Sequence, residues 1–227
     1  MRKIIIIGGT KGIGKALVEN LKNDFEIINI SRTASELEYK NIKQFQMDVL
    51  EDELPEILEA DALIYCPGSI NLKPISRLSL DDFKEDFNIN VLGAVKVIKK
   101  YLPVLKKGNT PSILLFSSVA VKLGMPFHAS IATAKGGVEG LVKSLGAELA
   151  PSIRVNAIAP TLTDTNLANK LLRNDEMKKK MIERHPLKKY LEPQEVADMA
   201  QFLISDKAAS ISGQIIELDC GIVSFKI

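Results

Sequence analysis

The feature that most constrains the fold is a run of four isoleucines that leads directly into a glycine-rich turn, at residues 4–14. An apolar β-branched run without polar alternation is typical of a strand buried on both faces, as in a parallel sheet. Gly8, Gly12 and Gly14 allow a sharp turn and a close approach of the backbone to a ligand. The helix that follows begins with free N–H groups and a positive dipole end. The turn therefore predicts nucleotide-pyrophosphate binding, although a ligand-free corner can use the same glycines.

Strand-like and helix-like segments alternate along the whole chain. The expected strands are Lys3–Ile7, Glu26–Ile30, Lys43–Met47, Ala62–Tyr65, Ser112–Phe116, Arg154–Ala157 and Gln214–Leu218. The expected helices are Gly14–Lys22, Leu54–Glu59, Leu80–Leu102, Ala129–Ala150, Asn166–Arg184 and Pro193–Ile204. This alternation predicts an α/β fold with a doubly wound, Rossmann-type parallel sheet of about seven strands and helices on both faces. Ser79 with Asp82 resembles a capping pair, and Pro193 suits a first helical turn.

Bulk properties favour one soluble domain that spans residues 1–227, with no internal repeat or linker. The formal net charge of +2 gives no reason to expect nucleic acid or a membrane as a partner. The first residues are too weakly apolar for a secretory segment. Cys66 and Cys220 lie far apart without metal-like spacing, so we expect no metal site and reduced thiols in a cytoplasmic protein.

The spacing of the glycines resembles the T-G-x-x-x-G-x-G turn of the short-chain dehydrogenase/reductase family, with Ile7 at the position of the threonine. The resemblance extends to Ser212-Gly213-Gln214 and Asp219 near the C-terminus. It implies an oxidoreductase that binds a nicotinamide dinucleotide and a small-molecule substrate.

The preferred cofactor is predicted from the end of the second strand. An NAD site places a carboxylate there, whereas this chain has Ile30-Ser31-Arg32. The guanidinium of Arg32 suits a 2′-phosphate, and Lys11 adds a second cation inside the glycine turn. In the resembled family either basic residue goes with NADP. The alternative is that both are solvated surface cations.

The resemblance assigns further positions to the cofactor. Asp48 and Val49 match the residues beside the adenine, and Gly68 is the one glycine kept from the family's Asn-Asn-Ala-Gly segment, here Tyr65-Cys66-Pro67-Gly68. A segment from Ile158 to Thr165 corresponds to the stretch over the nicotinamide. The full set of expected cofactor residues is Gly8, Thr10, Lys11, Gly12, Ile13, Gly14, Ser31, Arg32, Asp48, Val49, Gly68, Lys135, Pro160, Thr163 and Thr165.

The active-site pattern is incomplete. The family uses a serine that holds the substrate oxygen, a tyrosine that exchanges the proton, and a lysine that binds ribose and lowers the tyrosine pKa. Ser118 and Lys135 have the required spacing, and Asn90 matches the asparagine that holds a water beside the lysine. The tyrosine should stand at position 131, which is Ile131. An isoleucine donates no proton, so the tyrosine mechanism is excluded.

His128 is the candidate replacement. It lies seven residues before Lys135, the spacing that the family's bacterial enoyl reductases use for their tyrosine, and residues four and seven before Lys135 share its helix face. Imidazole serves as acid or base near neutrality. The alternative is an ordinary histidine at an exposed helix start. Ser130, Thr133 and Tyr65 are weaker substitutes.

Residues 170–189 carry a formal charge of about +5. In the resembled family this region is the lid over the substrate. A basic lid suits a phosphate-bearing substrate such as an acyl thioester of coenzyme A or an acidic carrier protein. The alternative is a solvated amphipathic helix.

The sequence favours an NADP-dependent oxidoreductase acting on a carbonyl or an activated C=C bond, with Ser118, Lys135, Asn90 and His128 as its catalytic groups. The alternative is a catalytically silent NADP-binding sensor or regulatory protein. Neither the substrate nor the direction of hydride transfer follows from the residues. Apolar positions on Leu80–Leu102 and Ala129–Ala150 lead us to expect a homo-dimer or homo-tetramer, for instance Val91, Ala94, Val95, Val138, Leu141 and Leu145.

Overall fold

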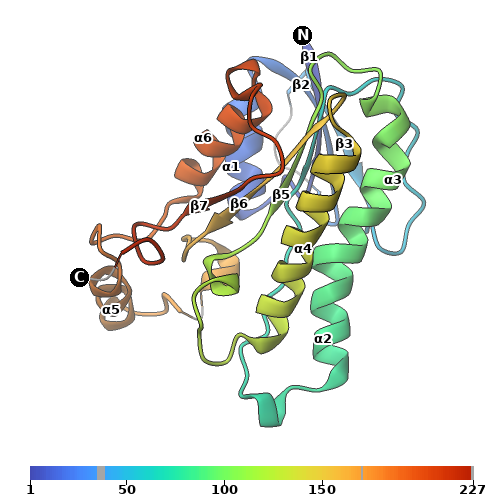
Figure 1. Cartoon of the computed structure of the whole chain (residues 1–227). Coiled ribbons are helices and arrows are strands. Elements are labelled where there is room, and N and C mark those ends of the chain that lie inside the picture. The colour runs from blue at the N-terminus through green and yellow to red at the C-terminus, as the bar shows by residue number, and fades with distance from the viewer. Residues whose placement is uncertain (35–38, 170, 226–227) are drawn as a thin grey trace.

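The computed structural model describes residues 1–34, 39–169 and 171–225. In this part of the chain a single seven-stranded parallel sheet has the order β3-β2-β1-β4-β5-β6-β7, with helices on both faces (Figure 1). The strands are β1 (Arg2–Ile7), β2 (Phe25–Ser31), β3 (Ile42–Gln46), β4 (Ala62–Tyr65), β5 (Ser112–Phe116), β6 (Arg154–Pro160) and β7 (Ile215–Leu218). The doubly wound parallel sheet predicted from the sequence is confirmed.

The α-helices differ from the predicted ones more than the strands do. They are α1 (Gly12–Leu21), α2 (Leu80–Phe87), α3 (Gly93–Leu105), α4 (Ala129–Glu148), α5 (Asp175–Arg184) and α6 (Pro193–Ile204). The capping box between Ser79 and Asp82 and the place of Pro193 at the start of α6 are confirmed. No helix within the described residues is long and apolar enough to cross a membrane.

The isoleucine run of β1 is buried on both faces of the sheet, because alternate residues enter two separate cores. Ile5 and Ile7 pack with residues of α3 and α4, whereas Ile4 and Ile6 pack with residues of α1 and α6. In Figure 1, α3 and α4 lie on one side of the sheet and α1 and α6 lie on the other. Each face of β1 therefore contacts an apolar cluster, which explains why apolar and polar residues do not alternate in this strand.

The strand order reverses beside β1. The chain moves outward from β1 to β2 and β3, and then returns to place β4 on the other side of β1. In open α/β sheets the crevice at the carboxyl ends of the strands, at such a reversal, is where ligands bind. The topology therefore locates the candidate site above β1 and β4.

The helix expected at Leu54–Glu59 is wrong, because this segment has no helical structure. Leu54, Ile57 and Ala60 are buried, and the residues between them are mostly exposed. Lys96 Nζ donates to the carbonyl oxygens of Leu50 and Asp52 (both 2.9 Å), which holds the preceding chain against α3. The apolar spacing that indicated a helix instead anchors an irregular segment to the core.

The single helix expected at Leu80–Leu102 is interrupted. It divides into α2 and α3 around a π-helical turn, Asn88–Leu92, and α3 extends to Leu105. Asn90 Nδ2 donates to the carbonyl oxygen of Asp86 (2.7 Å), the group that the backbone N–H of residue 90 would contact in an α-helix. The side chain thus competes for the backbone acceptor, and such widened turns are frequent at functional sites.

The helix expected at Asn166–Arg184 is also wrong in its first half. A short 3₁₀ turn covers Asn166–Ala168, and α5 begins only at Asp175. The side-chain oxygen of Asn174 accepts a hydrogen bond from Met177 N (2.9 Å), which starts a new helix there. Lys170, part of the expected basic stretch, lies outside the described residues.

The irregular segment at 54–59 provides a paired test of the corrected packing. Ile57 is 7% exposed and its neighbour Leu58 is 88% exposed. We expect Ile57→Ala to lower the free energy of unfolding by about 2–4 kcal/mol, because it removes buried methyl groups. Leu58→Ala should change it by no more than about 0.5 kcal/mol. Urea unfolding of both variants measures the difference, and equal losses would contradict the packing described.

Candidate functional site

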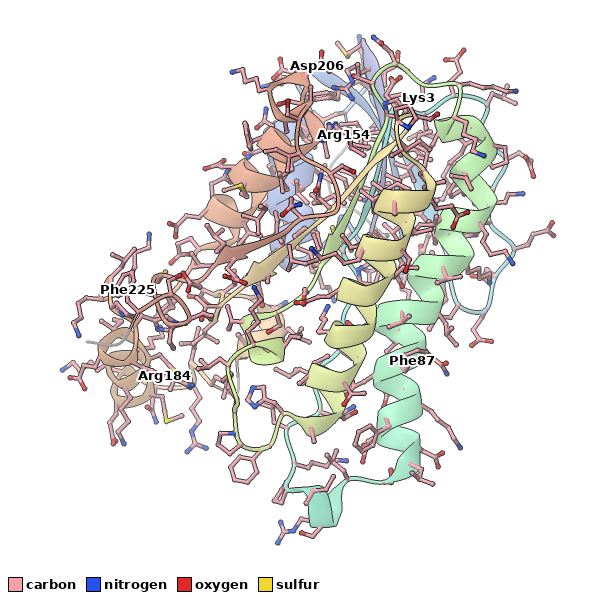
Figure 2. The ribbon with its side chains drawn as sticks, viewed as in Figure 1. Lys3, Phe87, Arg154, Arg184, Asp206 and Phe225 are labelled. Atoms are coloured by element: carbon pink, nitrogen blue, oxygen red, sulfur yellow. The ribbon has the colours of Figure 1, made fainter. Side chains whose placement is uncertain are left out.

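A cleft of about 530 Å³ opens at the carboxyl ends of the strands. The turn after β1, the ends of β2, β4, β5 and β6, the start of α4 and part of α5 form its walls. Arg184, on α5, lies at this end of the molecule, whereas Lys3, Arg154 and Asp206 lie at the other (Figure 2). Every residue that the sequence assigned to the cofactor lines this one cleft.

The glycine turn brings the start of α1 against the end of β1. Gly8 has φ +81°, a conformation that side chains disfavour, and a Cβ on Gly14 would lie 2.1 Å from the carbonyl oxygen of Gly8. Lys11 precedes α1 without a side-chain hydrogen bond to the helix. The first-turn N–H groups of α1 therefore remain free to bind an anion in the cleft.

Asn29, which the sequence analysis missed, holds this turn in place. It is buried in β2, and its Oδ1 accepts hydrogen bonds from Gly9 N (2.9 Å) and Ser31 Oγ (3.0 Å). The predicted cofactor residue Ser31 thus already donates its hydroxyl proton and is left with its lone pairs. The available signal was a polar residue inside the otherwise apolar run Ile27–Ile30.

Two cations lie at the outer edge of the cleft. Lys11 is exposed, and Arg32 is exposed with Nη1 3.9 Å from Asp48 Oδ2. Thr10 and Thr33 share a hydrogen bond of 2.8 Å between their hydroxyls, which links the glycine turn to the segment after β2. An exposed ion pair of this length contributes about 0–1 kcal/mol, so Arg32 is free to turn toward an anion in the cleft.

Lys135 is the buried cation of the site. Its Nζ donates to the carbonyl oxygen of Phe116 (2.8 Å), at the end of β5. Burial lowers the pKa of Lys135 to about 8, and the nearby Asp86 and Cys66 oppose that change. Burial raises the pKa of the Cys66 thiol to about 12. Cys66 therefore lines the cleft as a neutral thiol and does not act as a nucleophile.

Ser118, Ile131 and His128 line the cleft together with Lys135. Ser118 Oγ accepts a hydrogen bond from Ala120 N (3.2 Å), so its own proton remains available to donate. His128 is the residue immediately before α4. Its Nδ1 is 2.7 Å from the carbonyl oxygen of Pro126, which can only accept, so Nδ1 carries a proton and Nε2 is the nitrogen left for exchange.

Asn90 does not line the cleft but lies buried behind it. Both protons of its amide nitrogen have acceptors, Ser69 Oγ (2.9 Å) and the carbonyl oxygen of Asp86 (2.7 Å). Its Oδ1 is buried and has no partner among the described residues. A Cβ placed on Gly68 would lie 3.4 Å from this Oδ1 and 3.7 Å from Lys135 Nζ, so both atoms lie within 4 Å of one point.

The hydroxyls of the weaker candidates for proton exchange all donate hydrogen bonds to other acceptors. The hydroxyl of Tyr65 donates to the carbonyl oxygen of Ile89 (2.7 Å), and burial raises its pKa. Ser130 donates to Asp86, and Thr133 donates to the carbonyl oxygen of Ala129 (2.8 Å) on an exposed part of α4. Thr163, expected at the nicotinamide, donates to the carbonyl oxygen of Thr161 (3.0 Å).

A second histidine, His185, was not recognised as part of the cleft. It is buried at the end of α5, with Nδ1 2.7 Å from the carbonyl oxygen of Met181 and Nε2 2.7 Å from Thr161 Oγ1. Its Nδ1 therefore donates and its Nε2 accepts, which ties α5 to the end of β6. The only signal in the sequence was the scarcity of histidine, with two in the chain.

The described part of the basic stretch is mostly solvated, since α5 contains no buried residue. Lys180 pairs with Glu176 (2.8 Å), and Lys189 pairs with Glu195. Leu171, Met181 and Arg184 nevertheless line the cleft. This segment therefore contributes two apolar residues, Leu171 and Met181, and one cation, Arg184, to the cleft.

Several known proteins are similar to this chain. Residues 44–223 match a family model described as "Enoyl-(Acyl carrier protein) reductase". "Carbonyl reductase [NADPH] 2" of Sus scrofa is 28% identical, with 96% of this chain and 95% of that protein covered. A short chain dehydrogenase family protein from Francisella tularensis has a TM-score of 0.90 at 27% identity, covering 99% and 100% of the two chains. The structure "ElxO with NADP Bound" has a TM-score of 0.88 at 27% identity, covering 99% of each.

Proposed function

The chain belongs to the short-chain dehydrogenase/reductase family, and we propose that it is an NADP-dependent oxidoreductase that transfers a hydride to or from a carbonyl or an activated C=C bond of a small molecule. The observation that carries this proposal is the meeting of three groups in one cleft. They are the free N–H groups of α1, the buried Lys135 and the hydroxyl of Ser118.

The residues present fit a dinucleotide. A helix N-terminus without a side-chain cap suits the pyrophosphate, and the glycines leave the backbone accessible to it. Lys135, Asp48 and Val49 line the cleft. In this proposal Lys135 holds the nicotinamide ribose, and Asp48 and Val49 lie beside the adenine. When bound, the cofactor supplies or accepts the hydride.

The protein's own groups have separate roles in this proposal. Ser118 donates its free proton to the substrate oxygen and so holds it. Lys135 binds the ribose, and Asn90 offers its unpartnered oxygen to a water beside Lys135. The apolar wall from Met125, Leu171 and Met181 excludes water from the reacting atoms.

The proposed proton donor differs from the tyrosine that the family uses. Ile131 occupies the position where the family carries its tyrosine, and its buried side chain has no exchangeable proton. We assign the proton to Nε2 of His128, which lines the same cleft and whose other nitrogen is held by Pro126. An imidazolium supplies this proton when a carbonyl or enoyl group is reduced, and a neutral imidazole accepts it in the reverse direction.

The cofactor assignment predicts that NADPH binds more tightly than NADH. Arg32 and Lys11 flank the cleft edge, and the end of β2 has no carboxylate. We expect Arg32→Ala to weaken NADPH binding by about 1.5–3 kcal/mol and to leave NADH binding nearly unchanged. Lys15→Ala is the matched control, since Lys15 is an exposed cation of α1 outside the main cleft. Calorimetry that gave equal affinities for the two nucleotides in the unaltered protein would refute the NADP assignment.

A separate prediction concerns turnover. His128→Ala should lower the rate of substrate reduction by about 10²–10⁴-fold, the usual contribution of a general acid, and leave NADPH affinity unchanged. The measurement is NADPH oxidation at 340 nm against carbonyl and enoyl-thioester substrates.

The converse variant checks the rest of the site. Ile131→Tyr restores the family's proton donor, and a gain of carbonyl reductase activity is expected if Ser118 and Lys135 are competent. Full turnover by His128→Ala would show that His128 is not the donor. NADPH binding without turnover on any substrate would favour a nucleotide-sensing protein instead.

We also propose that the chain forms a homo-dimer or homo-tetramer. Of the apolar residues first named for this role, Val91, Ala94 and Val138 are buried in the core and are unavailable, which corrects the expectation for these three. Val95, Leu141 and Leu145 are only partly buried. Phe87 and Leu92 are instead exposed where α2 passes into α3. We expect an oligomer by light scattering at micromolar concentration and a monomer for Leu92→Asp. A monomeric unaltered protein would refute this assembly.

A further inference from the structure

A buried carboxylate outside the cleft has no role in the mechanism above. Asp86 of α2 is completely buried, and it forms no ion pair within the described residues. Its oxygens accept hydrogen bonds from Ser69 Oγ (2.5 Å), Ser130 Oγ (2.6 Å) and Asn71 Nδ2 (3.1 Å). All three neighbours are neutral donors, and their hydrogen bonds satisfy the buried oxygens of Asp86.

The direction of these hydrogen bonds determines how Asn90 is oriented. Ser69 Oγ donates its single proton to Asp86 Oδ1. Ser69 then has only lone pairs to offer Asn90, and the carbonyl oxygen of Asp86 is likewise an acceptor. The NH₂ group of Asn90 must face both of them, since the reversed amide would place its oxygen against two acceptors.

The opposite end of the same amide faces the active-site lysine. Asn90 Oδ1 is buried without a partner, and both it and Lys135 Nζ lie within 4 Å of one point beside Gly68. An acceptor at this point stabilises the ammonium form of Lys135, directly or through a water. The reversed amide would present two N–H donors to the ammonium group.

We propose that Asp86 is a positioning residue that acts through Ser69 to hold the oxygen of Asn90 toward Lys135. The inference rests on the proposed role of Lys135 in the oxidoreductase site. Asp86 touches neither the cleft nor the reacting atoms, and its influence passes through two hydrogen bonds.

The proposed positioning role of Asp86 differs from the direct effect of its charge on Lys135. The titratable groups that act on Lys135 are Asp86 on α2 and Cys66 after β4. Asp86 raises the pKa of Lys135 through its charge alone, whatever the orientation of Asn90. A variant that keeps the charge and breaks the link to Asn90 therefore separates the two effects.

The chain offers a matched pair of such variants. Ser69 and Ser130 donate to Asp86 at nearly equal distances, yet only Ser69 contacts Asn90. Ser69→Ala removes the link and keeps the carboxylate, Ser130→Ala removes a similar hydrogen bond and keeps the link, and Asp86→Asn removes the charge. Thermal unfolding of each variant verifies that it is folded.

The readouts require neither turnover nor nucleotide, so the result is independent of whether the proposed activity is found. One is the pH dependence of Lys135 acetylation by acetic anhydride, followed by mass spectrometry. The other is hydrogen exchange of the Asn90 side-chain NH₂ group, followed by NMR. The unaltered protein should show a midpoint near pH 8 and a protected amide.

We expect Ser69→Ala to lower the midpoint and to accelerate exchange of the Asn90 amide, with Ser130→Ala unchanged in both. Asp86→Asn should lower the midpoint further, by about one pH unit, because the charge is lost as well. An unaltered midpoint and amide in Ser69→Ala, or equal changes in Ser69→Ala and Ser130→Ala, would overturn the proposal. If Asp86→Asn does not fold, the two serine variants alone decide it.

Discussion

The contact between Gly14 and the carbonyl oxygen of Gly8 is the constraint on which the rest of the site depends. Only a residue without a side chain fits there, because a Cβ would lie 2.1 Å from that oxygen. The contact places the start of α1 directly over the end of β1, at the point where the strand order reverses. The free N–H groups, the cleft and the proposed cofactor orientation all follow from this placement.

Polar side chains inside the protein then determine the finer geometry. Asn29 holds the glycine turn from below, and Asn90 widens the helix between α2 and α3 into a π-turn. His185 ties α5 to the end of β6. Each of these side chains makes hydrogen bonds inside the protein, where a polar group without a partner destabilises the folded state. The backbone around each of them is therefore restricted to few conformations.

The sequence predicted strands better than helix limits. Apolar β-branched runs such as Ile4–Ile7 identify buried strands directly, because both of their faces need apolar neighbours. Helix periodicity is less specific. The spacing at 54–59 fitted an amphipathic helix, but the same three-residue interval anchors an irregular segment. The break between α2 and α3 depends on a side chain that bonds to the backbone, which periodicity does not reveal.

By itself, the sequence determined the parallel sheet, the nucleotide turn and the absence of a proton donor at Ile131, because these depend on local residue chemistry and on spacing along the chain. Only the tertiary structure decided that Arg32 lies near Asp48, that Tyr65 bonds to Ile89, and that Asp86 lies close enough to Lys135 to raise its pKa. These contacts join segments far apart in the chain. The hydrogen bond from Ser130 to Asp86, for example, exists only because α2 and α4 pack together on one face of the sheet.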